Sequence, residues 1–195
     1  FTGVDPVADS SVFKHSKIQE QYLLKVYKDL AGVYGPLFEF SEYLERVLTR
    51  TVAASDPVLD ARLSPASMDI ALSNSALEHL HPAPESVAIL CSWLRPGARF
   101  LHLVDLGNHL PTRNPFEGMY AVEPGEYFQR FGQGINLLRS PELLSLFIEH
   151  GAEATSIPYY FFREFFTGPI HPYWRKKFTE DVLFEKTVIL FGSIR

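Results

Sequence analysis

Three histidines stand at positions where a base could act on a ligand. His79 follows a short polar corner, His102 lies inside an apolar run, and His109 lies in a polar loop just after that run. A neutral imidazole accepts a proton near neutral pH, which is the chemistry of a general base. We expect His102 to be structural because it lies within a buried strand, whereas His109 can reach a ligand. His109 is therefore the predicted catalytic residue.

Other catalytic chemistries lack the residue spacing that they need. The sequence has no Cys-X-X-Cys or His-Glu-X-X-His pair for a metal ion and no Gly-X-Ser-X-Gly turn for a serine nucleophile. Its single cysteine, Cys91, lies in an apolar helical stripe and is expected to be a core residue. We therefore predict no metal site and no hydrolase of these kinds.

The elements that position these side chains can be read from residues 68–105. Residues 68–73 and 99–105 are apolar runs typical of buried strands. A helical stripe between them ends at Arg95-Pro96-Gly97 and consists of Val87, Leu90, Cys91 and Leu94. Strand, helix and strand predict a parallel crossover unit, whose strands end at one edge of a sheet.

Four short motifs in this unit point to a family: Met68-Asp69, Ser73-Asn74, Leu77-Glu78-His79 and Leu94-Arg95-Pro96-Gly97. At these residues the chain resembles the class I S-adenosylmethionine-dependent methyltransferases. The resemblance implies an α/β fold with a Rossmann-like methyltransferase sheet, mostly parallel with an antiparallel final strand and with helices on both faces. The alternative is an unrelated Rossmann-like domain, in which Asn74 caps a helix whose first turn holds Glu78 and His79.

The resemblance implies S-adenosylmethionine as cofactor and assigns residues to it. Asp5 follows a short strand and would accept hydrogen bonds from the ribose hydroxyls. Asp60 and Ala61 match an Asp-Ala pair that touches the adenine, and the alternative for Asp60 is an ordinary loop residue. The remaining predicted cofactor contacts lie where the first strand of the crossover unit ends, at Ser73, Asn74, Ser75 and His79.

The start of the chain lacks two features of the family. Phe1 is not a methionine, and neither the family's first strand nor its glycine-rich loop is present. We expect residues 1–195 to be a single methyltransferase-like domain that is truncated at its N-terminus and binds the cofactor poorly without the upstream strand and loop. The alternative is a degenerate cofactor site.

Apolar spacing predicts the elements outside the crossover unit. The expected helices cover residues 18–30 and 41–48, and a further helix begins at Ser140. The expected strands cover residues 52–59, 154–162 and 186–192, and the last two enclose an aromatic-rich insertion at residues 163–180. We expect this insertion to form an apolar wall for the acceptor; a homodimer contact or plain core is the alternative.

Composition limits the partners. The chain has 195 residues and a net charge of −5, so its charge gives no reason to expect nucleic acid, and it has no apolar run of membrane-spanning length. Its cysteine usage favours a cytoplasmic setting. The predicted function is methyl transfer from S-adenosylmethionine to a small or medium-sized acceptor. The alternative is a non-catalytic methyltransferase-like domain that binds a partner or scaffolds a complex.

Overall fold

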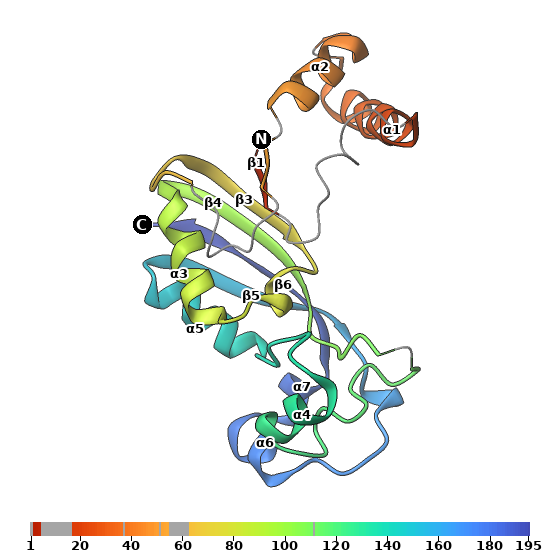
Figure 1. The fold of residues 1–195 in the computed structure, drawn as a ribbon, viewed down its shortest axis with the longest axis vertical. Helices are drawn as coiled ribbons and strands as arrows, with labels where there is room; N and C mark the ends of the chain where they lie inside the picture. The colour runs from red at the N-terminus through yellow and green to blue at the C-terminus, as the bar shows by residue number, and fades with distance from the viewer. Residues whose placement is uncertain (1, 5–16, 37, 51, 55–62, 111) are drawn as a thin grey trace. The chain divides into compact units, whose positions relative to one another are not determined.

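The computed structural model describes residues 2–4, 17–36, 38–50, 52–54, 63–110 and 112–195. The chain divides into two compact units, residues 1–62 and residues 63–195 (Figure 1). Among the described residues, no helix combines the length and the apolar character needed to cross a bilayer.

The described residues of the first unit form two helices and a two-stranded sheet. Strand β1 (Thr2–Val4) pairs in parallel with β2 (Val52–Ala54), and helices α1 (Lys17–Tyr34) and α2 (Phe40–Arg50) follow β1 along the chain. The two helices pack through aromatic rings, and the Tyr27 hydroxyl donates a hydrogen bond of 2.6 Å to the Phe38 carbonyl. Both predicted helices are therefore confirmed. The predicted cofactor residues Asp5, Asp60 and Ala61 lie outside the described residues.

The second unit is built on a four-stranded mixed sheet in the order β3-β4-β6-β5. Its strands are β3 (Met68–Asn74), β4 (Leu94–Asp105), β5 (Ala152–Phe161) and β6 (Glu185–Ile194). Strands β3 and β4 are parallel, and β6 runs antiparallel to both of its neighbours. Three strands therefore point one way, and the final strand is inserted between β4 and β5 in the reverse direction. The predicted α/β fold and its antiparallel last strand are confirmed. The sheet is only partly parallel, not mostly parallel as predicted, because the inserted β6 makes two of its three strand pairs antiparallel.

The helices of this unit fall into two groups. Helices α3 (Ala83–Trp93) and α5 (Ser140–Glu149) lie along the sheet (Figure 1). The others lie beyond the sheet and are α4 (Pro124–Phe131), α6 (Pro172–Lys177) and α7 (Glu180–Leu183), with single 3-10 turns at η1 (Leu77–His79) and η2 (Arg163–Phe165).

One face of the sheet forms the main core with α3 and α5. Alternate residues of β4, Phe100, His102 and Val104, are buried, and the Phe100 ring lies 4.7 Å from the ring of Phe147 on α5. The opposite face carries apolar side chains that are roughly half exposed: Ile70 (56%), Leu72 (61%), Leu101 (48%) and Ile157 (48%). Within residues 63–110 and 112–195, the helices that pack on this sheet therefore cover one face.

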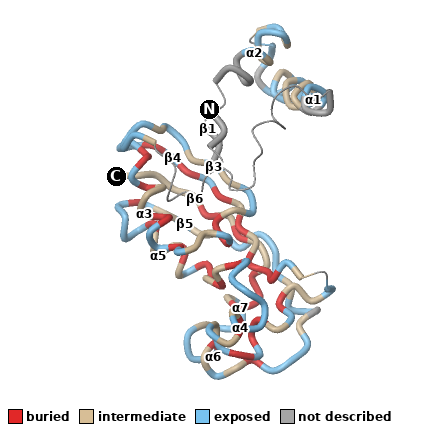
Figure 2. Tube along the Cα trace, viewed as in Figure 1, coloured by how far each residue is buried: buried red, intermediate tan, exposed pale blue. Residues whose placement is uncertain are grey.

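A second core lies beyond the ends of the strands, where Figure 2 shows buried residues around α4, α6 and α7. Trp174 is 1% exposed there, and its indole N–H donates to the Val122 carbonyl at 2.7 Å. Its ring meets that of Tyr120, which is also fully buried. Trp174, in the aromatic insertion between β5 and β6, is therefore a core residue, as in the alternative to the predicted wall for the acceptor.

The boundary between α3 and β4 differs from the prediction. Leu94 was assigned to the helical stripe, but it is the first residue of β4 and pairs with Met68 of β3. The next pair in the register is Ile70 with Arg99, so Pro96 and Gly97 lie in a bulge of the strand. Gly97 has φ +80, a left-handed conformation that glycine adopts without strain. The bulge allows the parallel pairing to begin immediately after the helix.

Candidate functional site

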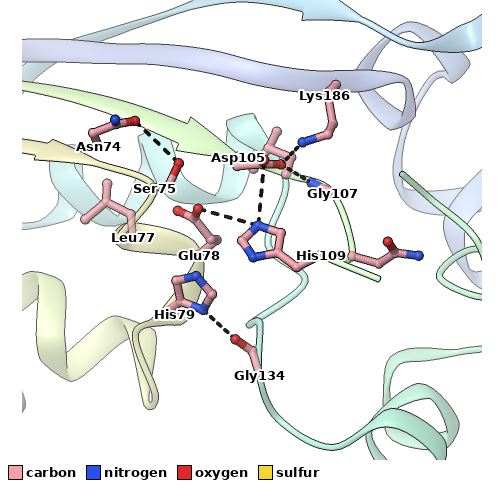
Figure 3. A network of polar contacts seen from close by, with 12 residues as sticks. Asn74, Ser75, Leu77, Glu78, His79, Asp105, Gly107, His109, Gly134 and Lys186 are labelled. Carbon is pink, nitrogen blue, oxygen red and sulfur yellow. Dashed lines mark hydrogen bonds and ion pairs between the residues drawn. The ribbon is translucent and has the colours of Figure 1, made fainter. Parts of the chain in front are cut away.

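Strands β3 and β4 end side by side and so bring polar residues to one edge of the sheet. Asn74, the last residue of β3, pairs with Leu103, two residues before the end of β4 at Asp105. The chain then turns sharply at Ser75, which has φ +50 and whose backbone N–H donates to the Leu103 carbonyl at 2.8 Å. Asn74 and Ser75 are both exposed, and they lie together at this edge (Figure 3).

Ser73 points away from this group. Its hydroxyl lies 2.7 Å from Nδ1 of His102, in the core between the sheet and its helices. Burial lowers the pKa of His102 to about 4, so this imidazole is neutral near pH 7. The structure thus gives His102 the predicted buried position in the strand. Because the Ser73 side chain contacts His102 in the core, only the backbone of Ser73 can contact a ligand at the edge of the sheet.

His79 lies on η1, next to the strand ends. Its Nδ1 is 2.6 Å from the carbonyl oxygen of Gly134. Asn136 holds the same turn, because its side-chain amide donates to the Leu77 carbonyl at 2.7 Å and its backbone N–H donates to the Glu78 carbonyl at 2.7 Å. The residue that precedes η1 is Ala76, with no side-chain cap, so the alternative in which Asn74 caps a helix is wrong.

His109 reaches the same group from the loop after β4. Its Nε2 lies 3.8 Å from Oε1 of Glu78 and 3.7 Å from Oδ2 of Asp105, and its ring centroid is 4.9 Å from that of His79. Its backbone has φ +56, an uncommon conformation outside glycine. Burial lowers the pKa of His109, and the negative charge of Asp105 partly opposes that effect. The structure therefore brings His79 and His109 together, although 29 residues separate them in the sequence.

The loop that carries His109 is fastened at both sides. Asp105 accepts hydrogen bonds through Oδ1 from the Gly107 backbone at 2.8 Å and from the ammonium group of Lys186 on β6. Asn108 is buried; its amide donates to the Glu117 carbonyl at 2.6 Å, and its Oδ1 accepts from the backbone N–H of Leu110 at 3.1 Å. His109 is thus held between two anchored neighbours.

Glu78 is the site residue that the sequence did not single out for chemistry. Its side chain is 3% exposed, and neither carboxylate oxygen has a hydrogen-bond partner within the part of the chain that the structure describes. Burial raises the pKa of this carboxyl group; its own backbone and the nearby His79 act in the opposite direction, and Asp105 adds to the increase. The only signal in the sequence is the Leu77-Glu78-His79 motif, which marks the residue but not its burial.

Comparison with known proteins gives no match to any family model and none to any curated protein. Among solved structures, a geranyl diphosphate methyltransferase in complex with S-adenosylmethionine is 13% identical, with a TM-score of 0.51, over all of this chain and 68% of that one. The chain has a methyltransferase-like fold. At this identity the likeness shows the fold alone.

Two further solved structures are more distant from this chain. A methyltransferase from Thermotoga maritima is 13% identical, with a TM-score of 0.45, over 80% of this chain and 69% of its own. Phosphoethanolamine N-methyltransferase 2 of Haemonchus contortus is 12% identical, with a TM-score of 0.47, over 92% of this chain. This chain spans about half of the Haemonchus protein, 53% of its length.

Proposed function

We propose that this protein transfers a methyl group from S-adenosylmethionine to the oxygen, nitrogen or carbon of a small or medium-sized acceptor. The observation that carries the proposal is the convergence of Asn74, Ser75 and His109 at the carboxyl ends of two parallel strands in a methyltransferase-like fold. Ligands of open α/β sheets bind at that edge.

The exposed polar groups at this edge suit a cofactor. Apart from a 3.4 Å contact between the Ser75 hydroxyl and Oδ1 of Asn74, the Asn74 side chain has no hydrogen-bond partner among the described residues. Its amide can therefore bond to a ligand, with Ser75 and His79 beside it. Asp5, Asp60 and Ala61 remain proposed cofactor contacts outside the described residues.

The chemistry asks little of the protein beyond positioning. The sulfonium of S-adenosylmethionine supplies an activated methyl group. The chain must then hold the acceptor in line with that group and remove a proton where the acceptor is a hydroxyl or an amine. His109 is the proposed base, because its imidazole lies at the edge on a fastened loop, close to the carboxylates of Glu78 and Asp105.

The test measures cofactor binding and turnover separately. Calorimetric titration with S-adenosylmethionine would be run on residues 1–195 and on a form extended upstream, followed by mass spectrometry of methylated products from a mixture of hydroxyl and amine acceptors. Asn74→Ala should weaken cofactor binding. His109→Ala should leave binding intact and slow turnover by about 10² to 10⁴-fold.

The matched control is His150→Ala, at an exposed histidine after α5, which should change neither quantity. Failure of both forms of the chain to bind the cofactor would refute the proposal and favour the non-catalytic binding or scaffold domain. Cofactor binding with unchanged turnover in His109→Ala would refute the role of His109 alone.

A further inference from the structure

Three potential metal ligands converge beside the proposed acceptor site. Glu78 and His79 come from η1, and His109 comes from the loop after β4. One ligand atom from each lies within 4.8 Å of the other two. Figure 3 shows the Glu78 carboxylate and both imidazole rings close together, and this cluster is the candidate metal centre.

Glu78 is the first reason to place a cation at this centre. Its side chain is 3% exposed and its two oxygens lack hydrogen-bond partners among the described residues. A buried carboxylate without a partner is unfavourable, and a positive ion is one of the few groups that can compensate it. Oε1 of this carboxylate lies 3.8 Å from Nε2 of His109 (Figure 3).

The orientation of His79 is the second, independent reason. Its Nδ1 lies 2.6 Å from the Gly134 carbonyl oxygen, which can only accept a hydrogen bond, so Nδ1 carries the proton. The Nε2 atom of the neutral ring therefore keeps its lone pair, and in Figure 3 this nitrogen lies on the side of Glu78 and His109. Histidine ligands of metal ions are commonly oriented by such a hydrogen bond from the other ring nitrogen.

The spacing of the third ligand is close to that of a metal site. Nε2 of His109 is 3.8 Å from Oε1 of Glu78. Bonds of about 2.0 to 2.2 Å to one ion would place two neighbouring ligand atoms roughly 3 to 3.5 Å apart, so small side-chain rotations suffice. Asp105 flanks His109 at 3.7 Å, but its other oxygen is bound to Gly107 and Lys186.

We propose that Glu78, His79 and His109 bind one divalent transition-metal ion, with the remaining coordination positions open to water or to an acceptor atom. Two imidazoles and one carboxylate favour ions such as Zn²⁺, Co²⁺ or Ni²⁺ over Mg²⁺ and Ca²⁺, which prefer oxygen ligands. The proposal rests on geometry and not on methyl transfer. With an ion bound, His109 would act on an acceptor through that ion rather than as the free base.

The experiment uses the untagged chain, stripped with a chelator, and measures binding of Co²⁺ by its visible absorption, with Zn²⁺ as competitor. The wild type should bind one ion per chain. His79→Ala, His109→Ala and Glu78→Gln should each weaken binding by about 100-fold or more, since each removes one of only three protein ligands. Bound metal should also raise the melting temperature of the wild type more than that of the variants.

The control is again His150→Ala, which should bind like the wild type. No stoichiometric binding by the wild type would overturn the proposal, and so would unchanged affinity in both His79→Ala and His109→Ala. A loss in His150→Ala as large as in those variants would identify adventitious binding by surface histidines and would equally overturn it. His79 and His109 are both exposed, so their replacement tests the site even if Glu78→Gln does not fold.

Discussion

Acidification should destabilise the chain through His102. This residue is 1% exposed, its Nε2 has no partner among the described residues, and burial lowers its pKa from 6.5 to about 4. The unfolded chain therefore binds a proton at His102 more readily than the folded chain. The resulting stability is complete above the unfolded pKa and is lost as the pH falls from 6.5 toward 4. Between pH 8 and pH 5, linkage with these two values gives a loss of about 2 kcal/mol.

Urea unfolding at pH 8 and pH 5 measures this loss, with each variant compared to itself. In His102→Gln the side chain no longer titrates, so its free energy of unfolding should fall by about 2 kcal/mol less than that of the wild type. His150→Gln replaces an exposed histidine and should behave like the wild type. Equal losses in the wild type and His102→Gln would refute the reasoning, because other groups would then account for the whole pH dependence.

Two further substitutions, both measured by urea unfolding, test the packing of the sheet. In Gly192→Ala the new Cβ would lie 2.1 Å from the Glu153 carbonyl oxygen and 2.7 Å from the Phe100 ring. We therefore expect the free energy of unfolding to fall by about 3 kcal/mol or more. Near wild-type stability would show that the strands can separate there. Asp69→Ala removes an exposed ion pair with Arg95, so the free energy of unfolding should change by less than about 1 kcal/mol. A loss twice as large would show that Asp69 does more than form this ion pair.

The sequence predicted the parts of the fold that depend on local periodicity. The strand from Met68, the helix over residues 83–93 and the closing hairpin all form where apolar runs predict them. The expected burial of the first strand is wrong, because its apolar residues Ile70 and Leu72 are more than half exposed. The prediction was wrong at Leu94, where pairing with β3 overrides the helical spacing. The same pairing brings Arg95 opposite Asp69, with which it forms an exposed ion pair. The register between two strands cannot be predicted from the local pattern of either strand.

The candidate site was only partly predictable for the same reason. Strand ends pointed to Asn74 and His109, since parallel strands end at one edge. The burial of Glu78 and the direction of the His79 ring depend on residues 134–136, more than fifty positions away, which have no periodic pattern that would place them. The sequence therefore shows the histidines as scattered, and the packing of a loop against η1 brings them together.

The cluster of Glu78, His79 and His109 differs from an ordinary polar network of a core in the hydrogen bonds that hold it in place. Asn136 holds η1 by its backbone carbonyls, and Asn108 holds the loop after β4 by the backbone of Glu117. Neither amide uses the carboxylate of Glu78 or Nε2 of the two histidines, which have no hydrogen bond within the described residues. A polar group that serves only the fold is normally satisfied by the fold. The buried carboxylate of Glu78, fixed in place without such a hydrogen bond, is therefore the feature that most favours the proposed metal ion.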